Sequence, residues 1–352
     1  MEGVDLDTTP AGSAAGLLTL LAMRGVGTRS AERIAARCGV LAEVKSASAR
    51  DLAGIPAAAL ATFRDERAWD AAAAQAAATL SQAESLGVRV VPVTGSEYPE
   101  LLRAIPDRPP VLFVRGKLRP SRRAVACVGT REPSKFGEEV ARRVAGFVAE
   151  RGYSIVSGLA LGVDTLAHEA ALDAKGHTVA VLANGLEAVY PKKNAGLAAR
   201  ILEAGGALVS EQPFGAPAIP RNLVARDRLQ SGMSLATVVM QTDVAGGSMH
   251  TVRFTLIQGR LLLAPVPAGE HSAEPKSQGI LAMTQKDGLQ FARLVRAEGE
   301  YEELLRREFA TCPVGIPIHG RDDYDAVLRL LESATDRAPG EVARVRPQLA
   351  LV

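Results

Sequence analysis

Short apolar runs alternate with helical stretches between residues 124 and 265. The helical stretches include Lys135–Glu150 and residues 197–203. Continuous apolar strands separated by helices are typical of a parallel sheet that is covered on both faces. This pattern predicts an α/β fold, a Rossmann-like, doubly wound domain with a mainly parallel sheet. The expected strands are residues 124–129, 154–157, 178–182, 207–210, 236–241 and 261–265.

The flanking segments have other patterns. Residues 1–12 are rich in Asp, Thr, Gly and Pro and are expected to form a disordered leader. Residues 13–87 are rich in Ala and Leu at helical spacing. In residues 88–123 strands are expected at 88–93 and 111–114, and the Pro and Gly around them indicate a connector with extended pieces. After a polar loop, helices are expected at 291–309 and 324–333, and the tail after Pro339 is expected to be loosely ordered. The predicted domains are an N-terminal helical domain (1–87), a connector (88–123), a Rossmann-like core (124–290) and a C-terminal helical extension (291–352).

Two glycine turns mark the N-terminal domain. Arg24-Gly25-Val26-Gly27-Thr28 precedes an expected helix at 30–37, and Leu52-Ala53-Gly54-Ile55-Pro56 is a weaker copy. A glycine hairpin that opens a helix exposes backbone N–H groups to a phosphate, which is the pattern of a helix-hairpin-helix (SAM-like) unit. The alternative is an ordinary packing module without a ligand, because paired glycines also serve plain turns.

Composition and charge narrow the function less than the pattern does. The chain of 352 residues is 47% hydrophobic, which is ample for a sizeable core, and its formal net charge of +2 gives no sign of a nucleic-acid partner. Any basic surface must therefore be a local patch. Cys38, Cys127 and Cys312 lie far apart, so neither a zinc site nor a disulfide framework is indicated. No signal-like or membrane-spanning apolar segment is found, and we expect a soluble, cytoplasmic protein without membrane contact.

Polar and cationic residues follow directly after the expected strands. Because the carboxyl ends of parallel strands meet at one edge of a sheet, ligands collect there. Glycines let backbone N–H groups face an anion, and the amino-termini of helices add a positive field. Such an edge suits phosphate, sugar and a stacked base, which mononucleotides and nucleic-acid strands both provide. The candidate residues are Gly129, Thr130, Arg131, Ser134, Ser157, Gly158, Lys192, Arg221, Asn222, Arg226, Arg228, Gly247 and Ser248.

The same loops contain an ordered set of short motifs. They are Gly129-Thr130-Arg131, Ser134, Gly137, Ser157-Gly158-Leu159-Ala160-Leu161-Gly162-Val163-Asp164, Ala167-His168, Tyr190-Pro191, Asn194, Ser210-Glu211 and Gly259-Arg260, with Tyr98-Pro99, Pro109-Pro110 and Arg115-Gly116 upstream. In order and spacing this set resembles the DNA-processing protein A (DprA/Smf) family over roughly residues 15–290. One glycine-rich loop is weak evidence, but an ordered set is strong.

The resemblance implies a protein that binds single-stranded DNA without strong sequence preference, commonly as a homodimer. It further implies that the protein loads a RecA-type recombinase onto the strand, notably during natural transformation. Carried over residue by residue, Arg131 and Lys192 would contact phosphates, and Gly129, Ser157 and Gly158 would offer backbone or hydroxyl contacts. The remaining cationic groove would be lined by Arg221, Asn222, Arg226 and Arg228.

The chain departs from the family pattern at three places. Asp227 stands where the family usually has Asn between two arginines, His250 replaces a β-branched apolar residue, and Gly246-Gly247-Ser248 replaces Ser-Gly-Ser. An Asp at position 227 repels phosphate unless Arg226 or Arg228 pairs with it. No winged-helix pattern is found in the tail. These differences indicate a divergent branch of the family.

Other functions stay open at this point. Asp164 and His168 could form an acid–base pair, but a helix cap and a packed histidine explain them better, and a hydrogen-bonding role is favoured for Glu211. No catalytic residue, metal ligand or cofactor is assigned. The alternatives to DNA binding are a nucleotide sensor or nucleotide-cleaving enzyme, and a protein-interaction scaffold built on the N-terminal helices.

Overall fold

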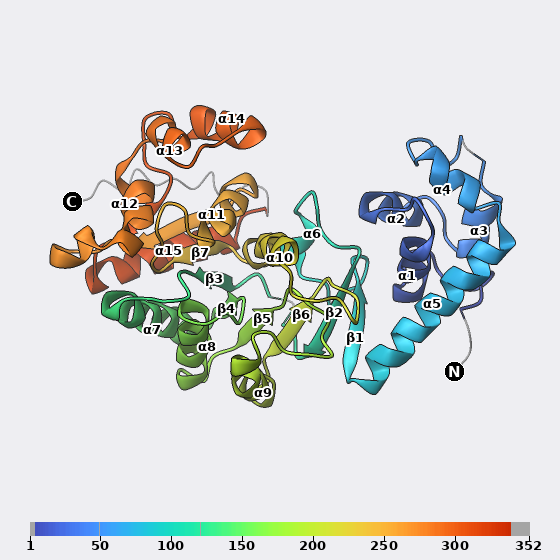
Figure 1. Ribbon diagram of the computed structural model, residues 1–352, viewed down its shortest axis with the longest axis horizontal. Helices are drawn as coiled ribbons and strands as arrows, with labels where there is room; N and C mark the ends of the chain where they lie inside the picture. Colours follow the sequence, from blue (N-terminus) through green and yellow to red (C-terminus); the bar gives the residue numbers. More distant parts are fainter. Residues whose placement is uncertain (1–3, 49, 120, 339–352) are drawn as a thin grey trace.

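The computed structural model describes residues 4–48, 50–119 and 121–338. Nine strands form one sheet in the order β1-β2-β6-β5-β4-β3-β7-β8-β9, which runs through the middle of the molecule (Figure 1). From β6 to β9 all pairs are parallel, whereas β1 and β2 are antiparallel to their neighbours. The strands are β1 Val88–Pro92, β2 Val111–Gly116, β3 Ala124–Val128, β4 Ser154–Ser157, β5 Thr178–Val181, β6 Ala207–Ser210, β7 Ala236–Val239, β8 Leu261–Pro265 and β9 Ile316–Ile318.

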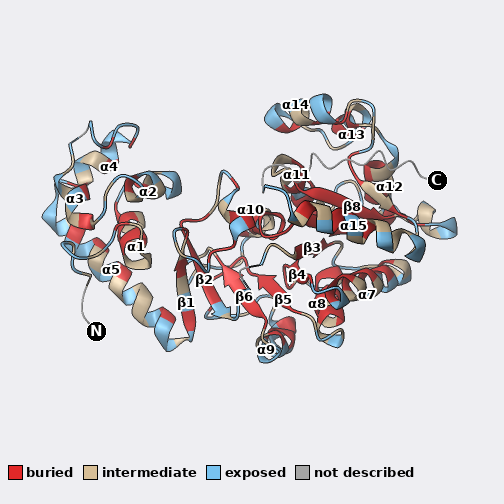
Figure 2. Cartoon of the chain, turned by 180° about the vertical axis from the view of Figure 1, so that it is seen from behind, coloured by how far each residue is buried: buried red, intermediate tan, exposed pale blue. Residues whose placement is uncertain are grey.

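Helices cover both faces of the sheet, because every residue of the central strands is buried and successive side chains point to opposite faces (Figure 2). Val125 and Cys127 of β3 pack with one set of helices, and Val128 packs with the other. The helices on the first face are α7 Lys135–Glu150, α8 Val163–Asp173, α9 Ala195–Glu203 and α15 Tyr324–Thr335; those on the second are α6 Glu100–Arg103, α10 Pro220–Gly232, α11 Ser248–Ile257, α12 Gln278–Gln285, α13 Gly288–Leu294 and α14 Gly299–Glu308. The predicted doubly wound, mainly parallel fold is confirmed.

The N-terminal helices form a separate lobe beside β1 (Figure 1). They are α1 Ala14–Ala22, α2 Thr28–Ala35, α3 Leu41–Ser46, α4 Ala57–Thr62 and α5 Glu66–Ser85. Trp69 is fully buried in this lobe and donates its indole N–H to the Phe63 carbonyl at 3.0 Å. Gly25 and Gly54, the two turn glycines, have φ values of 84° and 83°, a region that favours glycine.

Several expected elements differ in the structure. The described part of the leader is tied down, because Ala11 is fully buried and Pro10 forms a bridge to Val40. The strands expected at 88–93 and 111–114 within the connector are present as β1 and β2, and they pair into the main sheet. The single helix expected at 291–309 is two helices, with Arg296 at positive φ between them and Gly299, also at positive φ, as the first residue of the second. Strand β9 was not expected.

The expectation for the tail after Pro339 lies outside the described residues. Within the described ranges, no helix combines the length and apolar character that crossing a membrane requires. The division of the chain into four domains stays a prediction.

Candidate functional site

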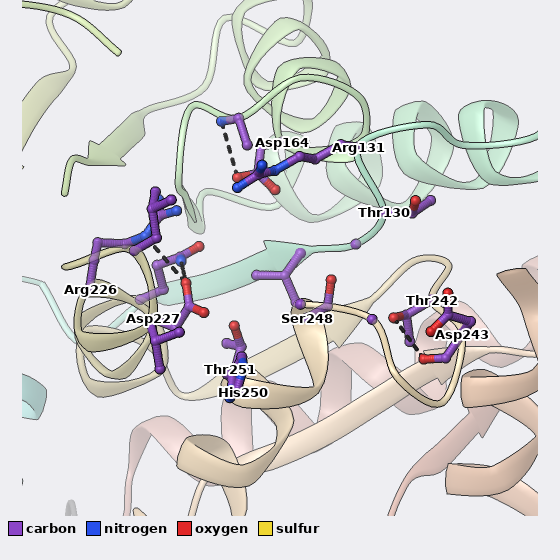
Figure 3. A pocket seen from close by; sticks show the side chains of 18 of the residues that line it. Thr130, Arg131, Asp164, Arg226, Asp227, Thr242, Asp243, Ser248, His250 and Thr251 are labelled. Carbon is purple, nitrogen blue, oxygen red and sulfur yellow. Dashed lines mark hydrogen bonds and ion pairs between the residues drawn. The ribbon is translucent and has the colours of Figure 1, made fainter. Parts of the chain in front are cut away.

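The central feature of the site is the switch point of the sheet. The chain runs outward from β3 through β4, β5 and β6, and then returns through α10 to place β7 on the other side of β3. At such a point the loops after the two neighbouring strands diverge and leave a crevice. A pocket of about 580 Å³ lies there, lined by residues 128–132, 160, 164, 220, 223–224, 226–227, 230, 242–243, 246–248 and 250–251. Figure 3 shows the side chains that surround it.

Glycines let the backbone approach closely behind this pocket. A Cβ atom on Gly129 would lie 2.6 Å from Cγ2 of Val163, and one on Gly158 would lie 1.7 Å from a guanidinium nitrogen of Arg226. Gly162, at the start of α8, has a φ of 75° and packs against the backbone of Arg131. The glycine-rich motif therefore brings the turns after β3 and β4 together beneath Arg226.

Arg226 is the buried cation of the site, with 5% of its surface exposed. It donates to the Val181 carbonyl at 2.7 Å, and its Nε lies 3.3 Å from the Asp227 carboxylate. Asp164 lies on the other side, where its carboxylate accepts from the backbone N–H groups of Gly158 at 3.0 Å and Ala160 at 3.3 Å. Arg226 thus pairs with Asp227, lies near enough to Asp164 to favour its charged form, and anchors the floor of the pocket to β5.

Burial shifts the pKa values of both carboxyl groups upward. For Asp227, burial raises the pKa to about 7, which Asp164 reinforces, while Arg226 and Arg131 oppose it. For Asp164, burial likewise raises the pKa against the effect of Arg226 and its backbone hydrogen bonds. The pocket is therefore less negative near neutral pH than its carboxyl count suggests.

Arg131 is the exposed cation at the rim (Figure 3). Within the described ranges, its guanidinium has no hydrogen-bond or ion-pair partner, so its charge is available to a ligand. A second, smaller pocket of about 90 Å³ adjoins it and shares Arg131, Ala160, Leu223 and Arg226 with the first. Tyr190, 46% exposed, and Leu161 give this second pocket an apolar wall.

The amino-terminus of α11 completes the larger pocket. Gly247 and Ser248 begin this ten-residue helix without a side-chain cap, and its first turn has no acidic residue. The backbone N–H groups of Met249 and His250 donate to the Gly246 and Gly247 carbonyls at 3.0 and 3.1 Å, so the N–H of Ser248 and the positive end of the helix dipole are what this helix start offers an anion. Thr251 and the exposed His250 lie one turn further along and also line the pocket.

The structure places other expected site residues elsewhere. Ser134 caps α7 and hydrogen bonds with Gln241 and the Glu274 carboxylate, the latter at 2.6 Å, so a carboxylate of the protein itself occupies that position. Ser157 is fully buried and donates to the Cys127 carbonyl at 2.6 Å. Neither hydroxyl lines either pocket.

Among the basic residues, Arg228 is the clearest departure from expectation. It forms a two-pronged ion pair with Glu211, with both N–O distances 2.6 Å, and also contacts Asp107 at 3.1 Å, outside the pocket. Asn222 donates to the Pro217 carbonyl at 3.0 Å. Lys192 and Arg221 are exposed near the site but line neither pocket.

The structure supports the structural interpretation of His168. It is fully buried, its Nδ1 lies 2.7 Å from the Thr178 hydroxyl, and burial lowers its pKa to about 3. It therefore stays neutral near neutral pH, and it lines neither pocket. Glu211 is occupied by Arg228, in line with the hydrogen-bonding role favoured for it.

Several pocket residues were missed by the sequence analysis. Thr242 and Asp243 come directly after β7, so the rule that located the other loops could have found them. Leu223 and Gln230 had no comparable signal, because only the orientation of α10 turns them toward the pocket. In the described part of the chain, no group of three or more His, Cys, Asp and Glu side chains has an arrangement that could hold a metal ion.

The fold and the pocket define a Rossmann-like α/β protein with a pocket at the switch point of its sheet. The chain belongs to the family described as DNA recombination-mediator protein A, whose model matches residues 89–298. This confirms the family resemblance found in the motifs.

Two relatives illustrate the similarity. The chain is 40% identical to Protein Smf of Escherichia coli over 204 residues, which cover 56% of this chain and 54% of the relative. It is 34% identical to DNA processing protein DprA of Bacillus subtilis over 223 residues, which cover 63% and 73% of the two chains. The chain thus matches about half the length of the first relative.

Solved structures share the fold. DprA from Streptococcus pneumoniae aligns with a TM-score of 0.59 at 24% identity, covering 84% of this chain and 98% of that one. DprA from Helicobacter pylori aligns with a TM-score of 0.52 at 23% identity, covering 69% and 96%.

Proposed function

We propose that this chain binds single-stranded DNA and assists homologous recombination, without chemistry of its own. The observation that carries the proposal is the exposed, unpaired guanidinium of Arg131 (among the described residues) at the rim of a pocket at the switch point. The uncapped start of α11 at Gly247 and Ser248 adds a second anion-binding element to the same pocket. A phosphate is the anion that matches both.

A strand fits this site better than a free anion, because two adjoining pockets share Arg131. The larger pocket, which is lined by Thr130, Ser248 and Thr251 beside Arg131, accommodates a phosphate and its sugar. The smaller pocket offers the exposed ring of Tyr190, and stacking of a base on an aromatic ring contributes about 1–3 kcal/mol. Lys192 and Arg221 extend the positive surface beyond the pockets.

The relatives support the same ligand. The matching family is described as a recombination mediator, and the Helicobacter pylori protein is described as having a unique single-stranded DNA binding mode. The family match does not support the alternative of a nucleotide-cleaving enzyme. A nucleotide sensor is the remaining rival, since a pocket of this volume also accommodates a mononucleotide.

The test is a fluorescence-anisotropy titration of labelled oligonucleotides at two salt concentrations. We expect tight binding at low salt that weakens steeply with added salt, as counterion release requires. Arg131→Glu should abolish binding, whereas Arg200→Glu, the same change at an exposed position on α9, should not. Absence of binding by the unaltered chain at low salt, with stabilisation by a mononucleotide instead, would favour the sensor.

We further propose that the chain forms a homodimer and loads a RecA-type recombinase. Both follow from the family resemblance. Light scattering measures the first, and the rate of recombinase filament formation on coated strands measures the second. A monomer at micromolar concentration, or no acceleration of filament formation, contradicts the respective proposal.

A further inference from the structure

One side of the larger pocket is built from hydrogen-bond acceptors. One oxygen of the Asp227 carboxylate, Oδ1, accepts from Nε2 of Gln230 at 2.9 Å and lies 3.3 Å from Nε of Arg226. The other oxygen has no hydrogen-bond partner among the described residues, and it is turned toward the interior of the pocket (Figure 3). An acceptor in this position is satisfied by a donor that enters the pocket.

Gln230 positions this carboxylate. Its side chain is 2% exposed, and its amide donates to Oδ1 of Asp227 at 2.9 Å, so Oδ1 is taken within the protein. The free oxygen of Asp227 is therefore the acceptor on α10 that a ligand can reach, and a ligand with N–H groups would satisfy it.

The positive groups of the pocket come from parts of the fold other than α10. Arg131 comes from the turn after β3, and the start of α11 at Ser248 follows β7, whereas Asp227 and Gln230 lie on α10. A phosphate is attracted to the first two and repelled by the carboxylate. A nucleotide can satisfy both sides, with its phosphate at Arg131 and the edge of its base at α10.

The four bases differ in what they offer a carboxylate. Guanine presents two adjacent donors, N1–H and the N2 amino group. Thymine has one imide N–H between two carbonyl oxygens, and adenine and cytosine place an acceptor nitrogen next to their amino group. On this edge guanine is the base with two adjacent donors, so both can point at the free carboxylate oxygen, whereas each other base brings one donor group with an acceptor beside it. Enzymes that take a base out of its stack read this same edge.

We propose that Asp227, supported by Gln230, selects guanine at the nucleotide that enters the larger pocket. This inference rests on the proposed function and adds a base preference at one position to a strand bound mainly through its phosphates. The Asp at position 227, a departure from the family pattern, is what creates the preference.

The experiment compares oligo-dT strands that carry isolated dG residues with strands in which each dG is replaced by dI, which lacks the N2 amino group. We expect the dG strand to bind the unaltered chain about tenfold more tightly than oligo-dT, and the dI strand to lose most of that gain. Equal affinity for all three strands would overturn the inference while leaving strand binding intact. This comparison needs no variant, so folding does not confound it.

A variant then assigns the preference to a residue. At pH 8, where the Asp227 carboxyl is mostly ionised, Asp227→Asn replaces an acceptor by a group that also donates, and should reduce the dG preference to less than twofold. Asp173→Asn, the same change at an exposed position on α8, should keep it. A dG preference that survives Asp227→Asn overturns the assignment.

Competition by dGMP tests whether the site takes guanine as part of a DNA strand or as a free mononucleotide. Weak competition, with dGMP needed at concentrations about a thousandfold above the strand, is expected for a strand site. If dGMP competes as well as the strand, guanine recognition stands and the proposed strand function fails. If no oligonucleotide binds, the proposed function fails whatever the base.

Discussion

Arg226 and Arg228 lie two residues apart on α10 and were both expected to line the groove. Successive residues of an α-helix are about 100° apart, so these two side chains point to nearly opposite sides of the helix. Arg226 holds the floor of the pocket with Asp227, whereas Arg228 pairs with Glu211 and Asp107 on the other side. The comparison shows that an arginine-rich helix can divide its charge between a binding site and a structural ion pair.

The largest expected effect concerns the outer side of α10. Arg228→Ala leaves the Glu211 carboxylate without its partner in a place where both side chains are only 13% exposed. We expect a loss of about 3 kcal/mol in the free energy of unfolding, as for other buried pairs. The folded variant should bind oligo-dT like the unaltered chain. Urea denaturation measures the free energy of unfolding, and fluorescence anisotropy measures the affinity for oligo-dT. Unchanged stability combined with weaker binding would show that Arg228 contacts DNA and is not a structural residue.

The second prediction concerns the side of α10 that faces the pocket, where Asp227 makes the stability of the fold depend on pH. Because burial raises the pKa of Asp227 to about 7 from an ordinary value of 3.8, the folded state gains stability through this group as pH falls below about 7. His168 acts in the opposite direction, because its pKa is lowered to about 3 and the unfolded state takes up a proton below about pH 6.5. In the unaltered chain the two effects offset one another.

Asp227→Asn removes the stability that the folded state gains when Asp227 takes up a proton, and leaves the opposing effect of His168. Relative to the unaltered chain, the variant should lose about 2 kcal/mol more stability between pH 7.5 and pH 5, from a slope near 1.4 kcal/mol per pH unit. Urea denaturation at both pH values is the measurement, with Asp173→Asn as the control. Parallel pH profiles for the variant and the unaltered chain would contradict the raised pKa.

A smaller effect tests the structural role of Ser134. Its hydroxyl caps α7, so Ser134→Ala should lower the free energy of unfolding by about 1 kcal/mol. Affinity for single-stranded DNA should not change, because the hydroxyl faces Glu274 and not the pocket. A tenfold loss of affinity at constant stability would show that the Ser134 hydroxyl contacts DNA, as the sequence analysis expected.

The smallest effect concerns Lys192, which is exposed beyond the pockets. If the strand continues past Tyr190, Lys192→Ala should weaken binding about threefold and make the dependence of log affinity on log salt shallower by close to one unit. An unchanged salt dependence would show that the strand leaves the protein before it reaches Lys192.

The strands of the core were predictable because burial on both faces leaves an unbroken apolar run, as in residues 207–210 and 261–265. The site's location followed from the same pattern, since loops after parallel strands share an edge. The strands at 88–93 and 111–114 were also predicted from their apolar runs, but the Pro and Gly around them indicated a connector, and only the pairing of β2 with β6 shows that they extend the main sheet. Strand β9 has three residues, too few for any periodic signal.

By itself the sequence determined the class of fold, the family and the edge of the sheet at which a ligand collects, because these depend on apolar periodicity and on motifs that are local in the chain. The tertiary structure alone decided which polar groups face the pocket. Ser134, Ser157 and Arg228 are turned to partners of the protein itself, and Leu223 and Gln230 are turned inward. The direction of a side chain depends on how its helix is rotated against the sheet and on which partner, distant in the sequence, packs next to it. Neither can be deduced from the spacing of neighbouring residues.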